Sequence, residues 1–398
     1  MKNSSLKLYL EINNLNYIFS VCEADKLDKI KIIYELELPL IGIENNRISD
    51  LEKVSDFIKK HIYIVEQKLN YTFKEIVLIL ENFDLTFTNL SGFKKLSGSQ
   101  ILRENVTYIL NTLKSCIDEN DEKKNVLHIF NSNFFLDNKK IENLPIGLFG
   151  DFYSHELSFV LINKSDRKNL KSVFDKCNLK IKKILVKSYV EGVNISGDNK
   201  NSETFFQITI NKKDSKIFYF ENNSLKFEQN FKFGTDVIIQ DISKIISFKK
   251  DIVENILSQI KFTSNLLEED LIEEKFFYNN NYRKIKKKLI YEIALARVNE
   301  IFELILLKNI NFNYYNKFSK NIYLKIVDKS HYQNFREIYE TTFSNNSLNK
   351  LFFQDSLSAE SMMNSVHKLV HFGWKKEAIP ISSYKKSLIN RFFDKIFG

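Results

Sequence analysis

The same order of elements is predicted twice along the chain. Near the start, three strand-like segments are followed by a helix, and the same order recurs in the second half. β-Branched and aromatic residues alternate or cluster in each segment, as they do in strands. The predicted strands cover residues 6–10, 17–22 and 29–37 in the first half and 204–210, 216–220 and 225–231 in the second. This repeat predicts two related α/β lobes.

Helices and further strands complete each half. Apolar residues at helical spacing predict a helix over 51–69, with Ser49 placed to cap its start. The remaining expected elements are helices over 165–176, 235–248 and 251–260, helices starting at His331 and Ser358, and strands over 75–81, 180–186 and 322–327. Two halves of this form resemble the architecture shared by actin, the heat-shock chaperone ATPases and the sugar kinases.

A different pattern interrupts the first half. Its expected elements are a strand near 85–90, a helix from Ser99, a strand over Val126–Phe130 and the turn Leu144–Gly150. The main pattern then resumes with a strand over 157–162. The expected boundaries are 1–82 and 153–198 for the first lobe, 83–152 for an inserted α+β subdomain, 199–345 for the second lobe with a helical part at about 245–305, 346–376 for a returning helix, 377–383 for a linker and 384–398 for a terminal helix.

Residues 384–398 predict a short amphipathic helix. Fifteen helical residues measure roughly 22 Å, too short to span the roughly 30 Å hydrocarbon core of a bilayer. Large apolar side chains share one face and Lys and Arg the other, which suits a helix lying on an anionic membrane surface. The alternative is a terminal helix docked on its own domain. The predicted lipid-binding residues are Lys385, Lys386, Leu388, Ile389, Arg391, Phe392, Phe393, Lys395, Ile396 and Phe397.

The overall charge is a weaker signal than its distribution. A net charge of +9 and a pI near 9.0 would suit binding to nucleic acid or to an anionic membrane. Lys, Asn, Ile and Phe are abundant throughout while Gly (10) and Pro (3) are scarce, which indicates compositional drift of the whole sequence. No aromatic stacking platform or groove-reading motif accompanies the basic residues, so we expect no nucleic-acid partner.

Cysteines and histidines indicate no metal or catalytic site. Cys22, Cys116 and Cys177 are widely spaced and form no C-x-x-C, so neither a disulfide framework nor zinc is predicted, and a reducing cytoplasm fits. His367 and His371 stand four apart as in H-E-x-x-H, but the Glu that would act as base is missing. No signal peptide and no uncharged apolar run near 18 residues is found, so we expect a soluble chain apart from its tail.

Four features in this order resemble the bacterial cell-division protein FtsA, an actin homologue that anchors the tubulin-like FtsZ ring to the membrane. The resemblance covers nearly the whole length. The four are the insert, with its His-containing strand Val126–Phe130 and Pro-x-Gly-x-x-Gly turn Leu144–Gly150; residues 215–242, with Gly234 and the pair Asp241 and Ile242 in register with a phosphate region; the helical span Lys286–Glu300; and the terminal amphipathic helix.

This resemblance implies an actin-like (ribonuclease H-like) two-lobed α/β fold with an inserted α+β subdomain and a C-terminal amphipathic helix. It implies an adaptor that binds the C-terminal tail of FtsZ, self-associates into filaments and lies peripherally on the cytoplasmic face of the cell membrane at the division site. Two alternatives stay open, an actin-like ATPase and an actin-like adaptor of a pilus or secretion machine.

ATP is the ligand that the resemblance implies, but both phosphate loops depart from the family pattern. Asp-Ile-Gly-Thr-x-Lys falls on Glu11–Asn16 and Asp-Ile-Gly-Gly-Gly-Thr on Thr209–Asp214, so every glycine of the loops is missing. An Asn can adopt the left-handed conformation, so Asn13 and Asn211 are expected to preserve the turns. By register the candidate nucleotide-binding residues are Glu11, Asn13, Asn14, Thr209, Asn211, Lys212, Lys213, Gly234 and Thr235.

Thr209 stands where the family has an Asp that would hold a metal-bound water. We therefore expect no hydrolysis, and ATP binding through unusual contacts stays open.

The resemblance also places Arg283, Arg297 and Glu300 where FtsA grips the acidic, extended tail of FtsZ. A long basic helix is predicted over 283–308, and its lysines near residue 286 would steer and hold an acidic peptide. The alternative is a solvated helix face with no partner.

Overall fold

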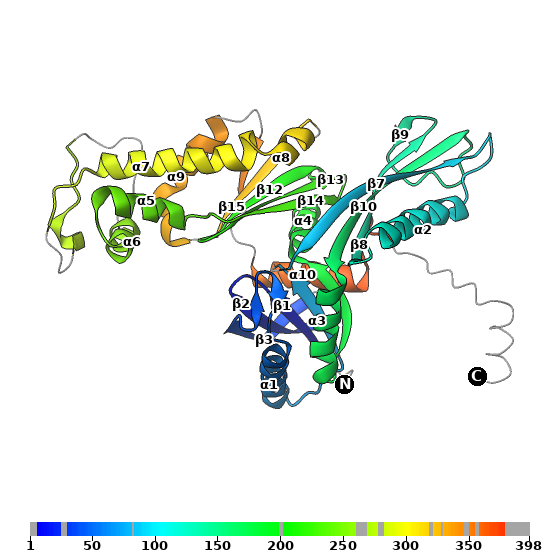
Figure 1. Ribbon diagram of the computed structural model, residues 1–398, viewed down its shortest axis with the longest axis horizontal. Coiled ribbons are helices and arrows are strands. Elements are labelled where there is room, and N and C mark those ends of the chain that lie inside the picture. Colours follow the sequence, from blue (N-terminus) through cyan, green and yellow to red (C-terminus); the bar gives the residue numbers. More distant parts are fainter. Residues whose placement is uncertain are drawn as a thin grey trace. The chain divides into compact units, whose positions relative to one another are not determined.

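The computed structural model describes residues 6–24, 30–81, 83–198, 202–259, 269–277, 282–317, 321–327, 329–345, 350–354 and 358–378 (Figure 1). The chain divides into two compact units. One joins Met1–Phe83 with Lys171–Gly373, and the other joins Asp84–Leu170 with Trp374–Gly398. The first unit contains two lobes, and the second contains the insert.

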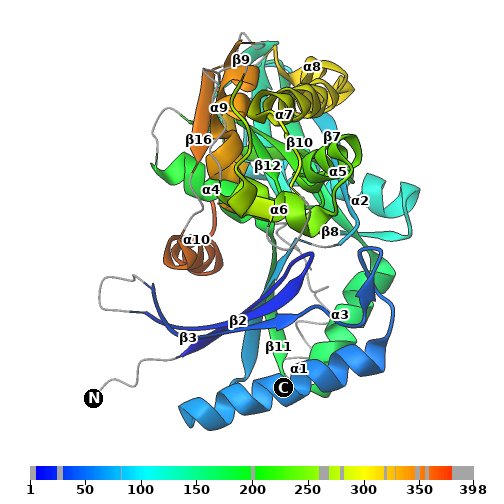
Figure 2. The same cartoon turned by 90° about the vertical axis from the view of Figure 1, so that its left-hand side faces the viewer.

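The first lobe is built on a five-stranded sheet in the order β11-β6-β1-β2-β3. β1, β6 and β11 run parallel, and β2 is antiparallel to both of its neighbours. Helices α1 (Leu51–Leu69) and α10 (Ala359–His371) lie on opposite faces of the sheet (Figure 2). The strands are β1 (Lys7–Ile12), β2 (Asn16–Ala24), β3 (Ile30–Pro39), β6 (Glu75–Leu80) and β11 (Lys180–Val186), and a hairpin of β4 (Ile43–Glu44) and β5 (Arg47–Ile48) precedes α1.

The second lobe repeats this sheet. Its order is β14-β13-β12-β15-β16, with the same parallel and antiparallel neighbours as in the first lobe. The strands are β12 (Phe205–Ile210), β13 (Ser215–Glu221), β14 (Ser224–Phe231), β15 (Asn321–Ile326) and β16 (Lys350–Gln354). The predicted repeat of two α/β halves is confirmed. β16 was not predicted.

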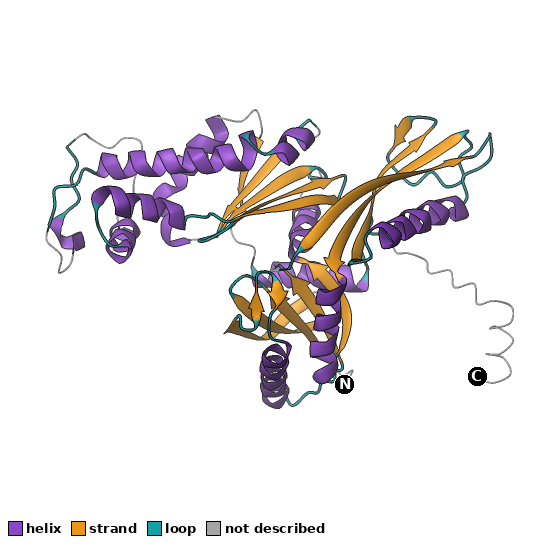
Figure 3. Ribbon diagram, viewed as in Figure 1, coloured by secondary structure: helices purple, strands orange, loops and turns teal. Residues whose placement is uncertain are grey.

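Helices form the other part of the second lobe (Figure 3). α7 begins at Lys287, four residues after the predicted start, and continues into a π-helical turn over Glu303–Leu307. Ile290, Ala294 and Val298 are buried along α7, which packs against α5 and α9. The helices are α5 (Asp236–Ile246), α6 (Lys250–Gln259), α7 (Lys287–Phe302), α8 (Ile310–Tyr315) and α9 (Lys329–Asn345), with a 3-10 turn at Glu274–Phe277.

A helix that the sequence analysis did not predict joins the two lobes. α4 (Lys187–Asp198) leads from β11 to β12, and Tyr189 and Val190 on it are fully buried. A Cβ on Gly192 would lie 2.1 Å from the ring of Phe220, so only glycine allows α4 to approach β13 this closely. Gly192 also lowers the helix propensity of the segment, which explains why the helix was missed.

The start of α1 corrects a predicted cap. Asp50, not Ser49, is the N-cap, because an Asp50 carboxylate oxygen accepts a hydrogen bond from the Lys53 amide at 2.9 Å. The amide of Ser49 instead donates to the carbonyl of Gly42 at 2.9 Å, which places Ser49 in the preceding turn.

The insert is a four-stranded sheet in the order β7-β10-β8-β9, with α2 packed beside it (Figure 3). Its elements are β7 (Leu85–Lys95), α2 (Arg103–Asn120), β8 (Lys124–Leu136), β9 (Lys139–Ile141) and β10 (Phe152–Asn163), and α3 (Lys164–Lys176) follows β10. An inserted α+β module was predicted and is present. Residues 157–162 were expected in the first lobe, but they lie in β10, which pairs with both β7 and β8. The apolar run suits a central strand of either sheet, so sequence alone could not place it.

The chain after α10 pairs with the insert. The amide of Ala378 donates to the carbonyl of Ile129, and the amide of Asn131 donates to the carbonyl of Lys376, both at 2.7 Å. Residues 376–378 therefore extend the insert's sheet along β8. Among the described residues, no helix combines the length and apolar character that crossing a bilayer requires.

Candidate functional site

The first predicted phosphate loop is the β1–β2 hairpin turn, and its hydrogen-bonding groups are used within the turn. Asn13 Oδ1 accepts from the amides of Leu15 at 2.9 Å and Asn16 at 2.7 Å, and the Asn13 amide donates to the Asn16 carbonyl at 3.1 Å. Asn13 is not among the residues with positive φ, so the expected left-handed turn is wrong here. The side chain of Asn13 closes the turn instead.

The second predicted phosphate loop is the β12–β13 hairpin turn, and its hydrogen-bonding groups are also used within the turn. The amide of Asn211 donates to the Asp214 carbonyl at 2.9 Å, and Asn211 Nδ2 donates to Asp214 Oδ1 at 2.7 Å. Lys212 pairs with Glu254 at 3.0 Å, while Lys213 is exposed. Asn211 also lies outside the positive-φ residues, so the left-handed turn expected there is wrong as well.

The start of α5 packs directly on this second loop. The amides of Thr235 and Asp236 donate to the carbonyls of Asn211 at 3.0 Å and Lys212 at 2.9 Å. A Cβ on Gly234 would lie 2.1 Å from the Asn211 carbonyl oxygen, so glycine is required for this close approach. The amides at the start of α5 are thereby paired with the protein's own carbonyl groups.

Six charged side chains meet where the two lobes face each other, and we call them the seam cluster. Lys187 Nζ lies 2.6 Å from one carboxylate oxygen of Glu81 and 2.8 Å from Glu11. Lys216 of the second lobe lies 3.3 Å from the other oxygen of Glu81. The seam cluster consists of Glu11 on β1, Glu81 after β6, Lys187 and Glu191 on α4, Lys216 on β13 and Lys325 on β15.

The second-lobe lysines flank Thr209. In the strand register Thr209 stands opposite Lys216 on one side and Lys325 on the other, so all three share one face of the sheet. Lys325 Nζ lies 3.1 Å from Glu191 on α4. Two ammonium groups therefore stand beside the position where the resemblance expects an Asp.

Burial and pairing set the ionisation of the cluster. Burial by itself would raise the pKa of Glu81, but Lys187 and Lys216 outweigh it and lower the pKa from its ordinary 4.5 to about 2. Burial would lower the pKa of Lys187, yet Glu81 and Glu11 raise it well above its usual value. Burial would likewise lower the pKa of Lys216, and Glu81 raises it. All three groups are charged at neutral pH.

Of the six residues in the seam cluster, only Glu11 was predicted from the sequence as a site residue. A signal was present, because Glu81 directly follows the buried apolar strand β6, and Lys216 and Lys325 lie within the mostly apolar strands β13 and β15. A lysine inside a buried strand needs a carboxylate partner.

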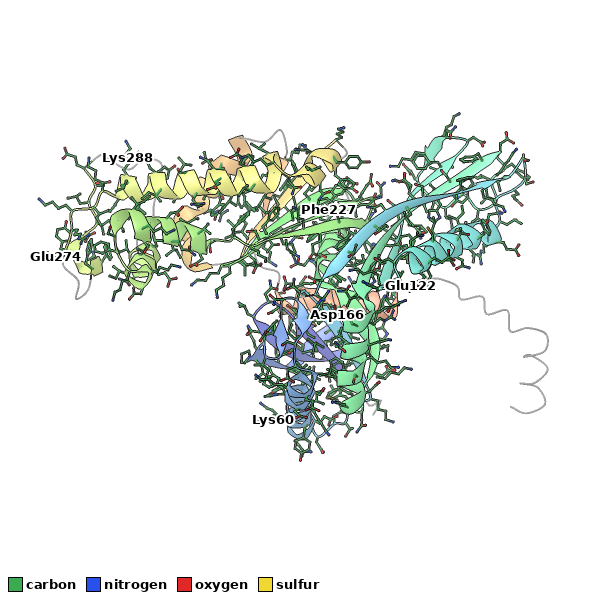
Figure 4. The ribbon with its side chains drawn as sticks, in the orientation of Figure 1. Lys60, Glu122, Asp166, Phe227, Glu274 and Lys288 are labelled. Atoms are coloured by element: carbon green, nitrogen blue, oxygen red, sulfur yellow. The ribbon has the colours of Figure 1, made fainter. Side chains whose placement is uncertain are left out.

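A second site lies at the start of α7. A cavity of about 410 Å³ is lined by Ile246, Lys284, Ile285, Lys286, Lys288, Leu289 and Glu292. The Arg283 guanidinium lies 5.1 Å from the ring centre of Phe248. Figure 4 shows Lys288 and Glu274 at this end of the helical part, away from Phe227 on the sheet. We call Arg283, Lys284, Lys286 and Lys288 the α7 basic end.

The structure joins Arg297 to Glu300 but not to Arg283. Arg297 Nη1 lies 2.5 Å from Glu300, and its guanidinium also binds Asp241 on α5. Arg283 precedes α7, lies 14 residues before Arg297 in the chain, and contacts Phe248 instead. The three predicted partner residues therefore do not form one contiguous contact.

The remaining predicted pair makes local contacts. His371 Nε2 lies 2.7 Å from Lys7 Nζ, and the rings of His367 and His371 lie at 36° to each other with centres 4.3 Å apart. Within the described parts of the chain, no group of His, Cys, Asp and Glu side chains is arranged to hold a metal ion.

Sequence comparison finds relatives of this chain among cell-division proteins. No family model matches the chain. The chain is 22% identical over 308 residues to the cell division protein FtsA of Buchnera aphidicola subsp. Schizaphis graminum (strain Sg), covering 76% of this chain and 73% of that protein. It is 23% identical over 300 residues to FtsA of Buchnera aphidicola subsp. Baizongia pistaciae (strain Bp), covering 74% and 70%. The chain is a divergent homologue of the FtsA proteins.

A solved structure shares the fold. The "PilM-PilN type IV pilus biogenesis complex" superposes on 92% of this FtsA homologue and 95% of that chain, with a TM-score of 0.54 and 8% sequence identity. Identity this low shows the fold alone. The predicted actin-like, two-lobed fold is confirmed. The predicted membrane helix over 384–398 lies outside the described residues, so its lipid-binding side chains stay a prediction.

Proposed function

We propose that this FtsA homologue is a cell-division adaptor that binds the C-terminal tail of FtsZ and tethers FtsZ filaments to the cytoplasmic face of the membrane. The name of its relatives, cell division protein FtsA, supports the process. The α7 basic end supports the partner, because its lysines border a cavity with apolar walls at Ile246 and Leu289. An extended acidic peptide with apolar side chains suits both features.

The α7 basic end is the observation that carries this proposal. Lys284 and Lys286 have no carboxylate partner among the described residues, so their charge is available to an acidic peptide. Arg297 has a secondary role, since a peptide carboxylate must share it with Asp241 and Glu300. We expect Arg283, Lys284 and Lys286 to supply most of the attraction and Arg297 to add less.

The membrane contact is assigned to the terminal helix. Its apolar face, with Phe392 and Phe393, would enter the lipid interface while Lys385, Lys386 and Arg391 meet anionic headgroups. A single short helix binds weakly and reversibly. Stable anchoring therefore requires several copies held in one filament, so we also propose that the chain self-associates.

A peptide-binding measurement tests the partner. In fluorescence anisotropy with a labelled FtsZ tail peptide, the double variant Lys284→Glu/Lys286→Glu should weaken binding by about tenfold, a loss of about 1.4 kcal/mol. Lys60→Glu, an exposed lysine on α1, is the matched control and should bind as the unmodified chain does. Equal affinity of all three proteins would contradict the proposed site. Recovery of a pilus component instead of FtsZ in a pull-down would favour a different actin-like adaptor.

A liposome measurement tests the tail. Phe392→Glu/Phe393→Glu should abolish co-sedimentation of the full chain with anionic vesicles, because burying each large side chain contributes up to about 1.5–3 kcal/mol and less at an interface. Tyr63→Glu, which changes an exposed aromatic residue on α1, should sediment normally. Undiminished sedimentation of the tail variant would remove residues 384–398 from the membrane contact.

A further inference from the structure

The fold family implies a bound Mg–nucleotide between the lobes, and the residues present decide whether that ligand fits. Phosphate groups need backbone amides that are not already paired, at turns which the chain can bring close. The amides of Leu15 and Asn16 are held by Asn13, and those of Thr235 and Asp236 are held by the carbonyls of the second loop. Both turns lack the glycines that permit close approach.

The carboxylates that could hold the magnesium ion are also unsuited to it. A magnesium ion prefers carboxylate and water oxygens, and in this seam the carboxylates are occupied by ammonium groups. Glu81 accepts from Lys187 and Lys216, Glu11 accepts from Lys187, and Glu191 pairs with Lys325. Thr209 brings no negative charge, and its neighbours across the strands are the two lysines. The residues present do not fit a Mg–triphosphate.

The charges of the seam cluster instead balance one another. The carboxylates Glu11, Glu81 and Glu191 face the ammonium groups Lys187, Lys216 and Lys325, and each named carboxylate contacts at least one of these lysines. The Lys216 and Glu191 side chains are 5% and 2% exposed. Ions this deeply buried are retained only when they are paired. A triphosphate would bring further negative charge beside three carboxylates whose cationic partners are already engaged.

The cluster also connects the lobes. Glu81 follows β6, and its amide donates to the Ile12 carbonyl at 3.0 Å, which fixes it to the first lobe. Lys216 lies on β13 of the second lobe and reaches the same carboxylate. Lys325 on β15 ties the second lobe to α4, the helix that joins the lobes, through Glu191. Opening the seam would separate these buried charges.

We propose that the seam cluster is a built-in ionic link that holds the two lobes together in the place of a Mg–nucleotide. The lobes are closed by the protein's own lysines, and closure does not depend on ATP. The chain then keeps one interlobe arrangement whatever the nucleotide concentration, and any self-association of the chain is equally independent of ATP.

Nucleotide binding by the full-length chain is the first test. Mg-ATP and Mg-ADP at about 1 mM should leave the thermal unfolding temperature unchanged, whereas a site with micromolar affinity would raise it. A fluorescent ATP analogue should show no saturable binding below about 1 mM. Saturable micromolar binding that unlabelled Mg-ATP displaces would overturn the proposal. This arm uses the unmodified chain and so does not depend on whether any variant folds.

Hydrogen exchange is the second test. Lys216→Met removes the second-lobe partner of Glu81 and should speed amide exchange in α4 and in the β1–β2 turn by tenfold or more. Lys226→Met is the matched control, because Lys226 is also a buried lysine paired with a glutamate, at 3.1 Å from Glu221, but both residues belong to the second lobe. The control should leave exchange in the β1–β2 turn unchanged. Unchanged exchange at the seam in Lys216→Met, or equal acceleration there in both variants, would refute an interlobe link.

Discussion

The seam cluster and the α7 basic end are both rich in lysine, yet they differ in how the charge is satisfied. In the seam, Lys187, Lys216 and Lys325 are largely buried, and each contacts a carboxylate. At the α7 basic end, Lys284 and Lys286 are exposed and lack a carboxylate partner among the residues that the structure describes. Lysine content alone is therefore a poor guide to a binding site.

The difference supports the α7 basic end as the proposed site for an acidic ligand. A buried lysine without a partner would be very costly, so the seam had to supply its own carboxylates, and with them it no longer needs an external anion. An exposed lysine costs nothing without a partner and stays available to one. Burial and pairing give the seam cluster a role in stability, and the exposed charge of the α7 basic end supports the recognition that we propose for it.

The largest expected effect comes from removing the shared carboxylate. Glu81→Ala leaves Lys216 without its 3.3 Å partner and Lys187 with Glu11 alone, so the free energy of unfolding should fall by about 3–5 kcal/mol. Lys284→Ala should change it by less than about 0.5 kcal/mol. Urea unfolding of both variants measures the contrast. Similar losses in the two proteins would mean that the seam cluster is not a special contributor to stability.

The second-largest effect is expected from acid, which should weaken the ion pairs of the seam cluster. The pKa of Glu81 is lowered from its ordinary 4.5 to about 2, so its stabilising contribution is complete above about pH 4.5 and is lost as the pH falls toward 2. The loss should be on the order of 3 kcal/mol. Lys187, Lys216, Glu11 and Glu191 face Glu81, and the two lysines stay charged throughout this range.

The matched comparison is Glu81→Gln, which cannot titrate at that position. The difference in unfolding free energy between the unmodified chain and Glu81→Gln should shrink as the pH is lowered from 5 to 2.5. A difference that stays constant over this range would show that Glu81 is not the group responsible.

Much of the fold was predictable because it rests on patterns that the backbone itself imposes. Both sets of three strands follow from alternating or clustered β-branched and aromatic residues, and α1 follows from a period of 3.6 in apolar residues. α4 was missed because Gly192 contradicts a helix locally, and only its packing on Phe220 explains the residue. Strand 157–162 was misplaced because a doubly buried strand carries no mark of the sheet to which it belongs.

The site was less predictable, since its residues come together only through tertiary contacts. Glu81 and Lys216 are separated by more than a hundred residues and meet across the two lobes. The register with the phosphate loops pointed to the β1–β2 and β12–β13 turns, but apart from Glu11 it did not predict the charged side chains that meet beside them. At the α7 basic end, local sequence was enough to find the lysines, while the pairing of Arg297 with Asp241 needed the packing of α7 on α5.

Salt should have the smallest effect, and it should distinguish the buried seam cluster from the exposed α7 basic end most clearly. Raising the ionic strength from about 0.05 M to about 0.5 M shortens the screening length to a few ångströms, which weakens exposed interactions and has little effect on buried ones. The affinity of an acidic tail peptide should fall several-fold because Lys284 and Lys286 are exposed. The stability difference between the unmodified chain and Glu81→Ala should change by less than about 0.5 kcal/mol, because the Lys216 side chain is only 5% exposed. Peptide affinity by anisotropy and urea unfolding at the same salt concentrations measure both. If the seam difference falls with salt as the peptide affinity does, water reaches the seam charges and the distinction between the two regions fails.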